Sequence, residues 1–304
     1  MTAPSTPPAR SKIDYLAIVA RGFCMGAADI VPGVSGGTMA FILGIYHELL
    51  NAIKAVDARF FRLLLTLRLK DAINHIPWRF LLSLGTGIIV AILTLAHLLE
   101  TQLDQNPTRV WAFFFGLVLA SVITVSRTIT NWNIKLISAV LIALVCTYLL
   151  LGVTSVNTPE TPSFLLISGA LAITAMILPG ISGAYVLVLL GKYRYILSAV
   201  NNRDLFTLAL VFAGALIGLA TFSRILSWLF KRYHNATVAT LTGLMLGSLR
   251  RIWPWKDPNS ISNPALPSHL DSEVAISIVL CVVGLSIVFL VTSLTSRKPP
   301  SNRF

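Results

Sequence analysis

Two copies of one short peptide hold the residues of this chain whose types and spacing could do chemistry. The peptide Pro-Gly-Val-Ser-Gly at residues 32–36 recurs as Pro-Gly-Ile-Ser-Gly at residues 179–183. Proline ends a helix, and glycine lets the backbone come close to a ligand. A helix that starts after each Pro-Gly would direct its free N–H groups and the positive end of its dipole at the turn. Such a turn can bind an anion, and a phosphate is the natural candidate.

The groups predicted to bind this phosphate are backbone amides and hydroxyls in and just after the two turns. The amides belong to glycines that allow close approach, and the hydroxyls supply further donors. The residues are Gly33, Ser35, Gly36, Gly37, Thr38, Gly180, Ser182 and Gly183. Tyr185 stands where the first copy has Thr38, so the two turns are not chemically equal.

Four charged residues in or near apolar segments are further candidates. Arg21 and Arg224 could each form hydrogen bonds with two phosphate oxygens, or their side chains could extend to the headgroup layer of a membrane instead. Asp29 lies three residues before Pro32 and has no acidic counterpart in the second copy. It could pair with Arg21 or bind a proton that couples transport, and Glu48 is a second candidate for such a charge role.

The elements that must position these residues are membrane helices. Of the 304 residues, 55% are hydrophobic and 12% are charged, which excludes an ordinary soluble domain. Crossing a hydrocarbon core takes roughly 20 helical residues. Six apolar stretches approach that length, at 80–99, 110–126, 134–151, 206–230, 236–249 and 274–295. We therefore predict an all-α polytopic membrane protein.

The chain also repeats itself. Residues 30–53 align with residues 177–200 at 10 identical positions of 24, with proline, glycine and serine in register, which shared hydrophobicity alone would not produce. Residues 112–121 align with 239–248 as well. Each repeat then has a re-entrant helical hairpin, whose tip is the Pro-Gly turn, and three transmembrane helices. If the hairpins instead span the membrane fully, each repeat has five crossings rather than three. Both numbers are odd, so the second repeat is inverted relative to the first in either case.

We assign residues 12–153 to the first repeat and 162–296 to the second, within one membrane domain. Residues 1–11 form a Pro/Ser/Thr-rich tail that we expect to be disordered, and residues 297–304 form a C-terminal tail. Residues 54–79 have no counterpart in the second repeat, and their charge pattern predicts an amphipathic helix lying in the membrane interface.

Charge indicates orientation rather than a nucleic-acid partner. The net charge is +12, but the basic residues lie at the ends of apolar segments instead of on one face. Most of them fall on the side of both termini, which predicts a multi-pass membrane protein with cytoplasmic termini. The three cysteines are odd in number and lie within apolar stretches, so we expect core residues and no disulfide framework.

The stretch Met-Gly-Ala-Ala-Asp-Ile-Val-Pro-Gly-Val-Ser-Gly-Gly-Thr at residues 25–38, with Leu-Pro-Gly-Ile-Ser-Gly at 178–183, resembles the bacterial polyprenyl-phosphate transporter family called PopT. The resemblance covers about residues 12 to 296. It implies a flippase of the bacterial cytoplasmic membrane. Such a flippase returns undecaprenyl phosphate, the lipid carrier of peptidoglycan and other envelope sugars, from the outer to the inner leaflet. It also implies phosphate contacts at Ser35 to Thr38 and at Ser182 to Ala184.

Two other classes stay open. An undecaprenyl-pyrophosphate phosphatase also has inverted re-entrant loops, but Gly36 and Gly183 stand where that family places an arginine, and no glutamate-rich motif is present. An anion or small-solute channel could use the same helix ends. We expect a transporter with no catalytic residue, cofactor or metal, whose partner is a membrane lipid. Proton or sodium coupling and homo-oligomer formation are left undecided.

Overall fold

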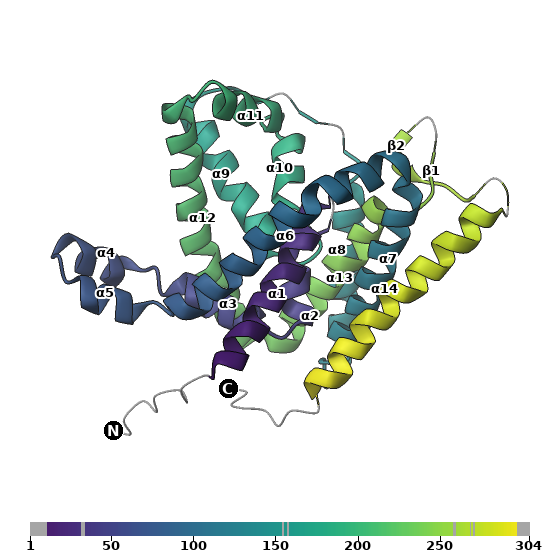
Figure 1. Ribbon diagram of the computed structural model, residues 1–304, viewed down its shortest axis with the longest axis horizontal. Helices are drawn as coiled ribbons and strands as arrows, with labels where there is room; N and C mark the ends of the chain where they lie inside the picture. Colours follow the sequence, from purple (N-terminus) through teal and green to yellow (C-terminus); the bar gives the residue numbers. More distant parts are fainter. Residues whose placement is uncertain are drawn as a thin grey trace.

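The computed structural model describes residues 11–31, 34–153, 155–156, 158–257, 260–267, 269 and 271–296, and they are almost entirely helical (Figure 1). The first half contains α1 (Lys12–Ile30), α2 (Gly36–Ile42), α3 (Tyr46–Lys54), α4 (Ala58–Leu65), α5 (Leu69–His75), α6 (Trp78–Gln105), α7 (Pro107–Ser126) and α8 (Ile134–Leu150). The second half contains α9 (Pro162–Ile177), α10 (Gly183–Leu189), α11 (Tyr193–Asn201), α12 (Leu205–Arg232), α13 (His234–Ile252), the short antiparallel strands β1 (Lys256–Asp257) and β2 (Ser260–Pro264), and α14 (Ser272–Ser296).

Several of these helices are long and apolar enough to cross a membrane. Within the described residues, α6, α7, α12 and the 272–293 part of α14 pass that test by length and composition. The pair α10 and α11 passes together but is bent by 105°, as a broken span or a re-entrant loop would be. Helices α8 and α9 are apolar but shorter. The predicted all-α polytopic membrane fold is confirmed.

Corresponding helices occur in the same order along the chain in the two halves. α2 and α10 have 7 residues each, α3 and α11 have 9, and α6 and α12 have 28. Figure 1 shows α3 in the lower part of the body and α11 at its upper edge, as an inverted second half would require. The exact repeat boundaries remain a prediction.

Glycines at matching positions bring the paired helices together. α1 packs along α6, where a Cβ on Gly87 would lie 2.7 Å from the amide nitrogen of Phe23. α9 packs along α12, where a Cβ on Gly214 would lie 2.7 Å from the carbonyl carbon of Leu166. Any side chain at these positions would push the helix axes apart, so small residues set these interfaces, as is common between membrane helices.

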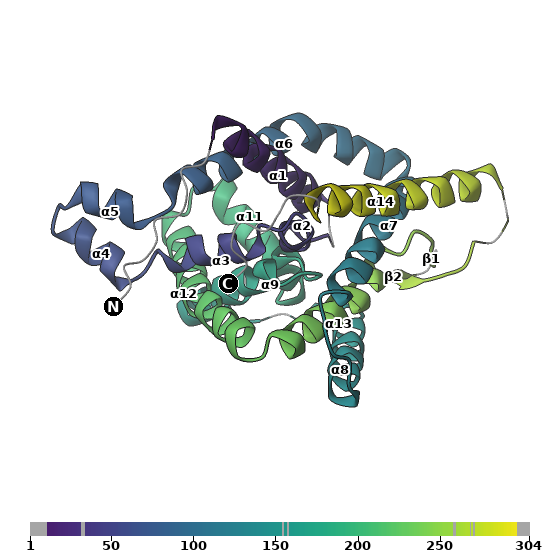
Figure 2. The same cartoon turned by 90° about the horizontal axis from the view of Figure 1, so that it is seen from below.

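The last helix of each half packs against the other half. α14 lies along α7, as both views show, and α8 lies along α13 (Figures 1 and 2). A Cβ on Gly116 of α7 would lie 2.7 Å from the carbonyl carbon of Cys281 on α14. Where these two helices begin, Arg109 Nη2 and a Glu273 carboxylate oxygen form an ion pair of 2.6 Å. Each half thus packs its last helix against a helix of the other half.

The segment without a repeat partner forms two short helices, α4 and α5, rather than the single helix expected. Figures 1 and 2 show them projecting from the body beside α3. The chain turns between them at Leu67, which has a positive φ of 55°. His75 Nε2 lies 3.1 Å from Asp57 Oδ1 and ties the end of α5 to the start of α4. Leu65, Leu67 and Leu69 are mostly exposed, which fits the predicted placement at a membrane surface.

Candidate functional site

The first hairpin turns because α1 ends just before Pro32 and α2 starts at Gly36. The position before a proline disfavours helical geometry, so α1 stops at Ile30. Ser35 is the N-cap of α2, and its Oγ accepts a hydrogen bond of 3.2 Å from the amide of Gly37. α2 therefore begins at the predicted turn. Gly33 lies outside the described residues.

The second hairpin turns at Gly180, whose backbone requires glycine. Its φ is +92°, and a Cβ there would lie 2.9 Å from the Cα of Met245 on α13. A side chain would be strained by the backbone angle and would also collide with α13. α9 ends at Ile177 and α10 begins at Gly183, so this turn matches the first one in position.

The two tips are in direct contact through hydrogen bonds, although they are about 140 residues apart in sequence. Ser35 Oγ donates to the carbonyl oxygen of Leu178 at 3.2 Å, a sequence separation of 143. The amide of Gly180 donates to Thr38 Oγ1 at 3.0 Å. Tyr46 Oη donates to the carbonyl oxygen of Ile177 at 3.0 Å. We call this contact, formed by Ser35, Thr38 and Tyr46 with residues 177–180, the tip junction.

The tip junction is buried between the halves. Ser35 is 2% exposed, Thr38 is fully buried and Tyr46 is 2% exposed. Close packing continues at Gly37, where a Cβ would lie 2.8 Å from the carbonyl oxygen of Ile177. Polar groups buried at this depth must find partners, and here each hairpin supplies partners for the other.

Asp29 occupies the start of α2 instead of pairing with Arg21. Its Oδ1 accepts a hydrogen bond of 2.7 Å from the amide of Gly36. The carboxyl group fits only because residue 36 is a glycine, since a Cβ there would lie 2.7 Å from Asp29 Cγ. An acidic side chain of the protein therefore sits where the sequence predicts an external anion.

The second tip contributes its backbone more than its side chains. Ser182 is half-buried, and its hydroxyl forms no hydrogen bond with any other described residue. Ala184 is exposed. Tyr185, the counterpart of Thr38, points away from the junction toward α8, where its hydroxyl donates to the carbonyl oxygen of Leu150 at 3.4 Å. The two copies of the motif thus have different surroundings, as the substitution of Tyr185 for Thr38 suggested.

The other charged candidates do not join the tip junction. Arg21 is half-buried on α1 and Arg224 is exposed on α12, and neither forms a hydrogen bond or ion pair in the part of the chain that the structure describes. Glu48 is half-buried on α3. Tyr46 was not among the predicted site residues, although its recurrence as Tyr193 was a visible signal.

In this arrangement three of the predicted amide donors are already engaged. The Gly36 amide donates to Asp29, the Gly37 amide to Ser35 and the Gly180 amide to Thr38. A phosphate would reach these three donors only by replacing their internal partners. An anion that did so would meet amides and hydroxyls from both halves.

Comparison with known proteins agrees with the resemblance drawn from the motif. The family model described as undecaprenyl phosphate translocase-like matches residues 25–269. The chain is 43% identical over 245 residues to a protein of Vibrio cholerae serotype O1 named polyprenyl-phosphate transporter, covering 81% of this chain and 80% of that one. It is 28% identical over 261 residues to a Staphylococcus aureus protein of the same name, covering 80% and 88%.

No solved structure matches the chain. The family match spans both Pro-Gly turns and ends in the loop after β2, so it takes in the whole tip junction. On this match and the 43% identity, the chain belongs to the undecaprenyl phosphate translocase-like family.

Proposed function

We propose that this protein is a flippase that returns undecaprenyl phosphate from the outer to the inner leaflet of the bacterial cytoplasmic membrane. The relatives in Vibrio cholerae and Staphylococcus aureus are named polyprenyl-phosphate transporters, which supports the substrate class. Broken helices that meet at the interface of two repeats are the usual place where secondary transporters bind their cargo. In our proposal the phosphate crosses at the tip junction, while the prenyl chain stays in the lipid.

One observation carries the assignment of the phosphate to this place. The amide of Gly36 already holds an anionic oxygen, the Asp29 carboxylate, at 2.7 Å. A phosphate oxygen offers the same kind of acceptor, and it could replace the carboxylate once the tips separate. Ser35 and Thr38 would then exchange their bonds to Leu178 and Gly180 for bonds to the phosphate.

Asp29 would couple this exchange to a proton. A charged carboxylate competes strongly with the phosphate for the Gly36 amide and repels it, whereas a protonated carboxyl group is a weaker acceptor and does not repel it. Protonation would thus make the carboxyl group easier to displace from the amide and favour phosphate binding. In this account Glu48 has no direct part, because it lies on α3 rather than at the start of α2.

Transport can be measured in vesicles that carry undecaprenyl phosphate in both leaflets. A soluble phosphatase added outside hydrolyses only the lipid that reaches the outer leaflet. Vesicles with the protein should lose nearly all of their lipid phosphate, while hydrolysis in protein-free vesicles should stop once the lipid of the outer leaflet is consumed. If the same fraction of the lipid is hydrolysed in both preparations, the protein is not a flippase. The double variant Ser35→Ala/Ser182→Ala should slow the hydrolysis of lipid that starts in the inner leaflet, because it weakens phosphate binding.

The rival hydrolytic function has its own test. Purified protein is incubated with undecaprenyl pyrophosphate, and released inorganic phosphate is measured. We expect no release above the background of protein-free detergent. Release that depends on the protein would replace the transporter assignment with a phosphatase.

A further inference from the structure

Four basic side chains from three helices gather on one side of the tip junction. They come from α3, the end of α12 and the start of α13, and they are His47, Lys54, Lys231 and His234. The buried ring of Phe230 contacts both imidazoles, because its centre lies 4.8 Å from that of His47 and 6.0 Å from that of His234. Lys231 follows Phe230 directly in the chain. We call the four residues the basic cluster.

No internal ion pair balances the charge of the basic cluster. None of its side chains forms a hydrogen bond or ion pair with another residue that the structure describes. Glu48 follows His47 on α3, but adjacent residues of a helix do not face each other. Burial lowers the pKa of Lys54, and the positive charge of Lys231 lowers it further. The two ammonium groups therefore repel each other, and a bound anion would offset this repulsion.

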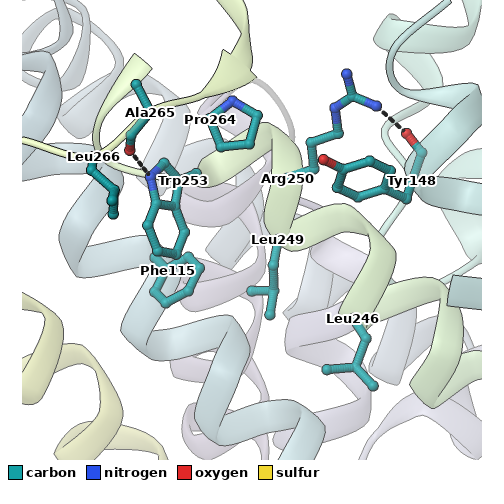
Figure 3. Close-up of a pocket in the computed structure, with 9 residues that line it drawn as sticks. All are labelled: Phe115, Tyr148, Leu246, Leu249, Arg250, Trp253, Pro264, Ala265 and Leu266. Carbon is teal, nitrogen blue, oxygen red and sulfur yellow. Dashed lines mark hydrogen bonds between the residues drawn. The ribbon is translucent and has the colours of Figure 1, made fainter. Parts of the chain in front are cut away.

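Cations at the other end of the bundle are held by internal partners instead. Figure 3 shows Arg250, near the end of α13, donating to the carbonyl oxygen of Tyr148 at 2.7 Å. Its guanidinium also lies 4.3 Å from the centre of the Tyr148 ring. Lys192, just before α11, donates to the carbonyl oxygen of Thr158 at 2.6 Å. The basic cluster differs from these cations because no described residue accepts its hydrogen bonds.

The basic cluster also occurs on one side of the protein only. α6 and α12 align over their full length at an offset of 127 residues, and α3 aligns with α11 at an offset of 147. Three members of the cluster have no basic counterpart in the other repeat: Asp104 matches Lys231, Pro107 matches His234 and Asn201 matches Lys54. Arg194 matches His47. The two sides of the protein therefore offer different charges to an anion that crosses between them.

Tyr46 connects the basic cluster to the tip junction. Its hydroxyl donates to the carbonyl oxygen of Ile177 within the junction. Its ring centre lies 6.0 Å from that of Phe230 and 6.5 Å from that of His47. Figure 1 shows α3 and the lower end of α12 on the side of the molecule where α1 begins and α14 ends. In the proposed orientation this side is cytoplasmic, so a phosphate that has passed the tip junction would reach the basic cluster next.

A phosphate monoester suits the donors of the basic cluster. It carries up to two negative charges near neutral pH and several acceptor oxygens. Each lysine offers a charged ammonium group, and each imidazole keeps one N–H donor even when it is neutral. We propose that the basic cluster binds the phosphate group of polyprenyl phosphate on the cytoplasmic side, as the lipid leaves the tip junction. This inference rests on the proposed function and adds the place where the lipid is released.

A photoreactive amino acid at Asn51 reports a lipid at the basic cluster directly. Asn51 is exposed and lies four residues after His47 and three before Lys54, on the same face of α3. The full-length protein, in nanodiscs of phosphatidylcholine, is illuminated with radiolabelled undecaprenyl phosphate. Lys54→Gln/Lys231→Gln should lower labelling about tenfold, because two hydrogen bonds between charged groups are lost. Unchanged labelling in this double variant would overturn the proposal.

Three further variants separate a specific site from a general effect of charge or folding. Lys54→Arg/Lys231→Arg keeps both charges and should retain most of the labelling. Arg194→Gln removes the cation that matches His47 in the other repeat and should leave labelling unchanged; a tenfold loss there would refute a specific site. If thermal denaturation shows that the double glutamine variant folds poorly, Lys231→Gln alone changes only an exposed side chain. It should still lower labelling several-fold, and unchanged labelling would again overturn the proposal.

Competition identifies the source of the phosphate. Unlabelled undecaprenyl phosphate should compete fully, whereas phosphatidylglycerol and inorganic phosphate should compete weakly. If phosphatidylglycerol competes as well as undecaprenyl phosphate, the basic cluster is an ordinary contact with anionic lipid and the proposal fails. If inorganic phosphate competes equally well, the cluster binds free phosphate rather than the lipid, and the proposal fails for that reason.

Transport measured on the same protein preparation separates the release site from the proposed function. Normal transport by the wild type together with unaltered labelling in Lys54→Gln/Lys231→Gln refutes the release site and leaves the flippase standing. Lysine-dependent labelling without any transport by the wild type supports the binding site and refutes the flippase.

Discussion

The amide of Gly180 donates a hydrogen bond of 3.0 Å to the Thr38 hydroxyl, joining the tips of two hairpins that are 142 residues apart. Both partners are buried, and each comes from a copy of the same motif. The bond therefore links the halves at the place where each helix is broken.

The variant Thr38→Val tests the strength of this link. Valine has the same shape but no acceptor, so the buried Gly180 amide loses its partner. We expect the free energy of unfolding to fall by about 1 to 3 kcal/mol. Thr38→Ser keeps the hydroxyl and should lose less. Thermal unfolding in detergent measures both, and a Thr38→Val protein at least as stable as Thr38→Ser would show that the bond contributes little.

Asp29→Asn tests whether this residue couples transport to protons. The asparagine side-chain oxygen can still accept the Gly36 hydrogen bond, so the variant should fold, but it cannot take up a proton. We expect an imposed pH gradient to change the transport rate of the wild type and of Glu48→Gln, but not that of Asp29→Asn. A gradient response in Asp29→Asn equal to that of the wild type would remove Asp29 from the coupling mechanism.

Gly87→Ala and Gly85→Ala compare two glycines of the same helix. A Cβ on Gly87 would lie 2.7 Å from the Phe23 amide nitrogen, whereas a Cβ on Gly85 would meet nothing within 4 Å. Overpacking should lower the stability of Gly87→Ala by about 1 to 3 kcal/mol. Gly85→Ala should be neutral or slightly stabilising because alanine favours helix. Equal melting temperatures would show that α1 and α6 are not tightly packed there.

The burial of Lys256 should make the free energy of unfolding depend on pH. Burial, with a smaller effect of Arg251, lowers the pKa of Lys256 from its ordinary 10.5 to about 8. The folded protein thus loses this proton at a lower pH than the unfolded chain does. The free energy of unfolding should rise between about pH 8 and 10.5, and this gain is absent below the lower pKa.

Lys256→Met removes the titrating group and serves as the comparison. The stability difference between wild type and variant should change through this pH range and stay flat below it. A difference that is constant with pH would show that the lysine is not buried in solution.

The membrane helices and both turns could be predicted from the sequence because their signals are local. Apolar length predicts α6, α7, α12 and α14, and a proline followed by glycine predicts where α1 and α9 end. The close helix contacts also had a signal, because Gly22 and Gly87 recur in register as Gly169 and Gly214.

The packing of α8 against α13 and of α14 against α7, each in the other half, could not be predicted, because nothing in either helix specifies its partner. The hydrogen-bond partners within the tip junction could not be predicted for a similar reason. Asp29 could have paired with Arg21, and only the fold shows that it reaches Gly36 instead. The segment at 54–79 has an amphipathic pattern, which predicted one helix. The turn at Leu67 that divides it could not be predicted, because the residues around it include no glycine or proline.

A reversible cross-link at the tip junction tests the central claim most directly. Cysteines replace Ser35 and Leu178, whose Oγ and carbonyl oxygen lie 3.2 Å apart, in a chain without its three natural cysteines. A short reducible linker then joins the tips, and lipid-phosphate transport is measured before and after reduction. If phosphate crosses between the tips, the linked protein should not transport and reduction should restore the rate. Transport at the full rate with the linker in place would contradict the account.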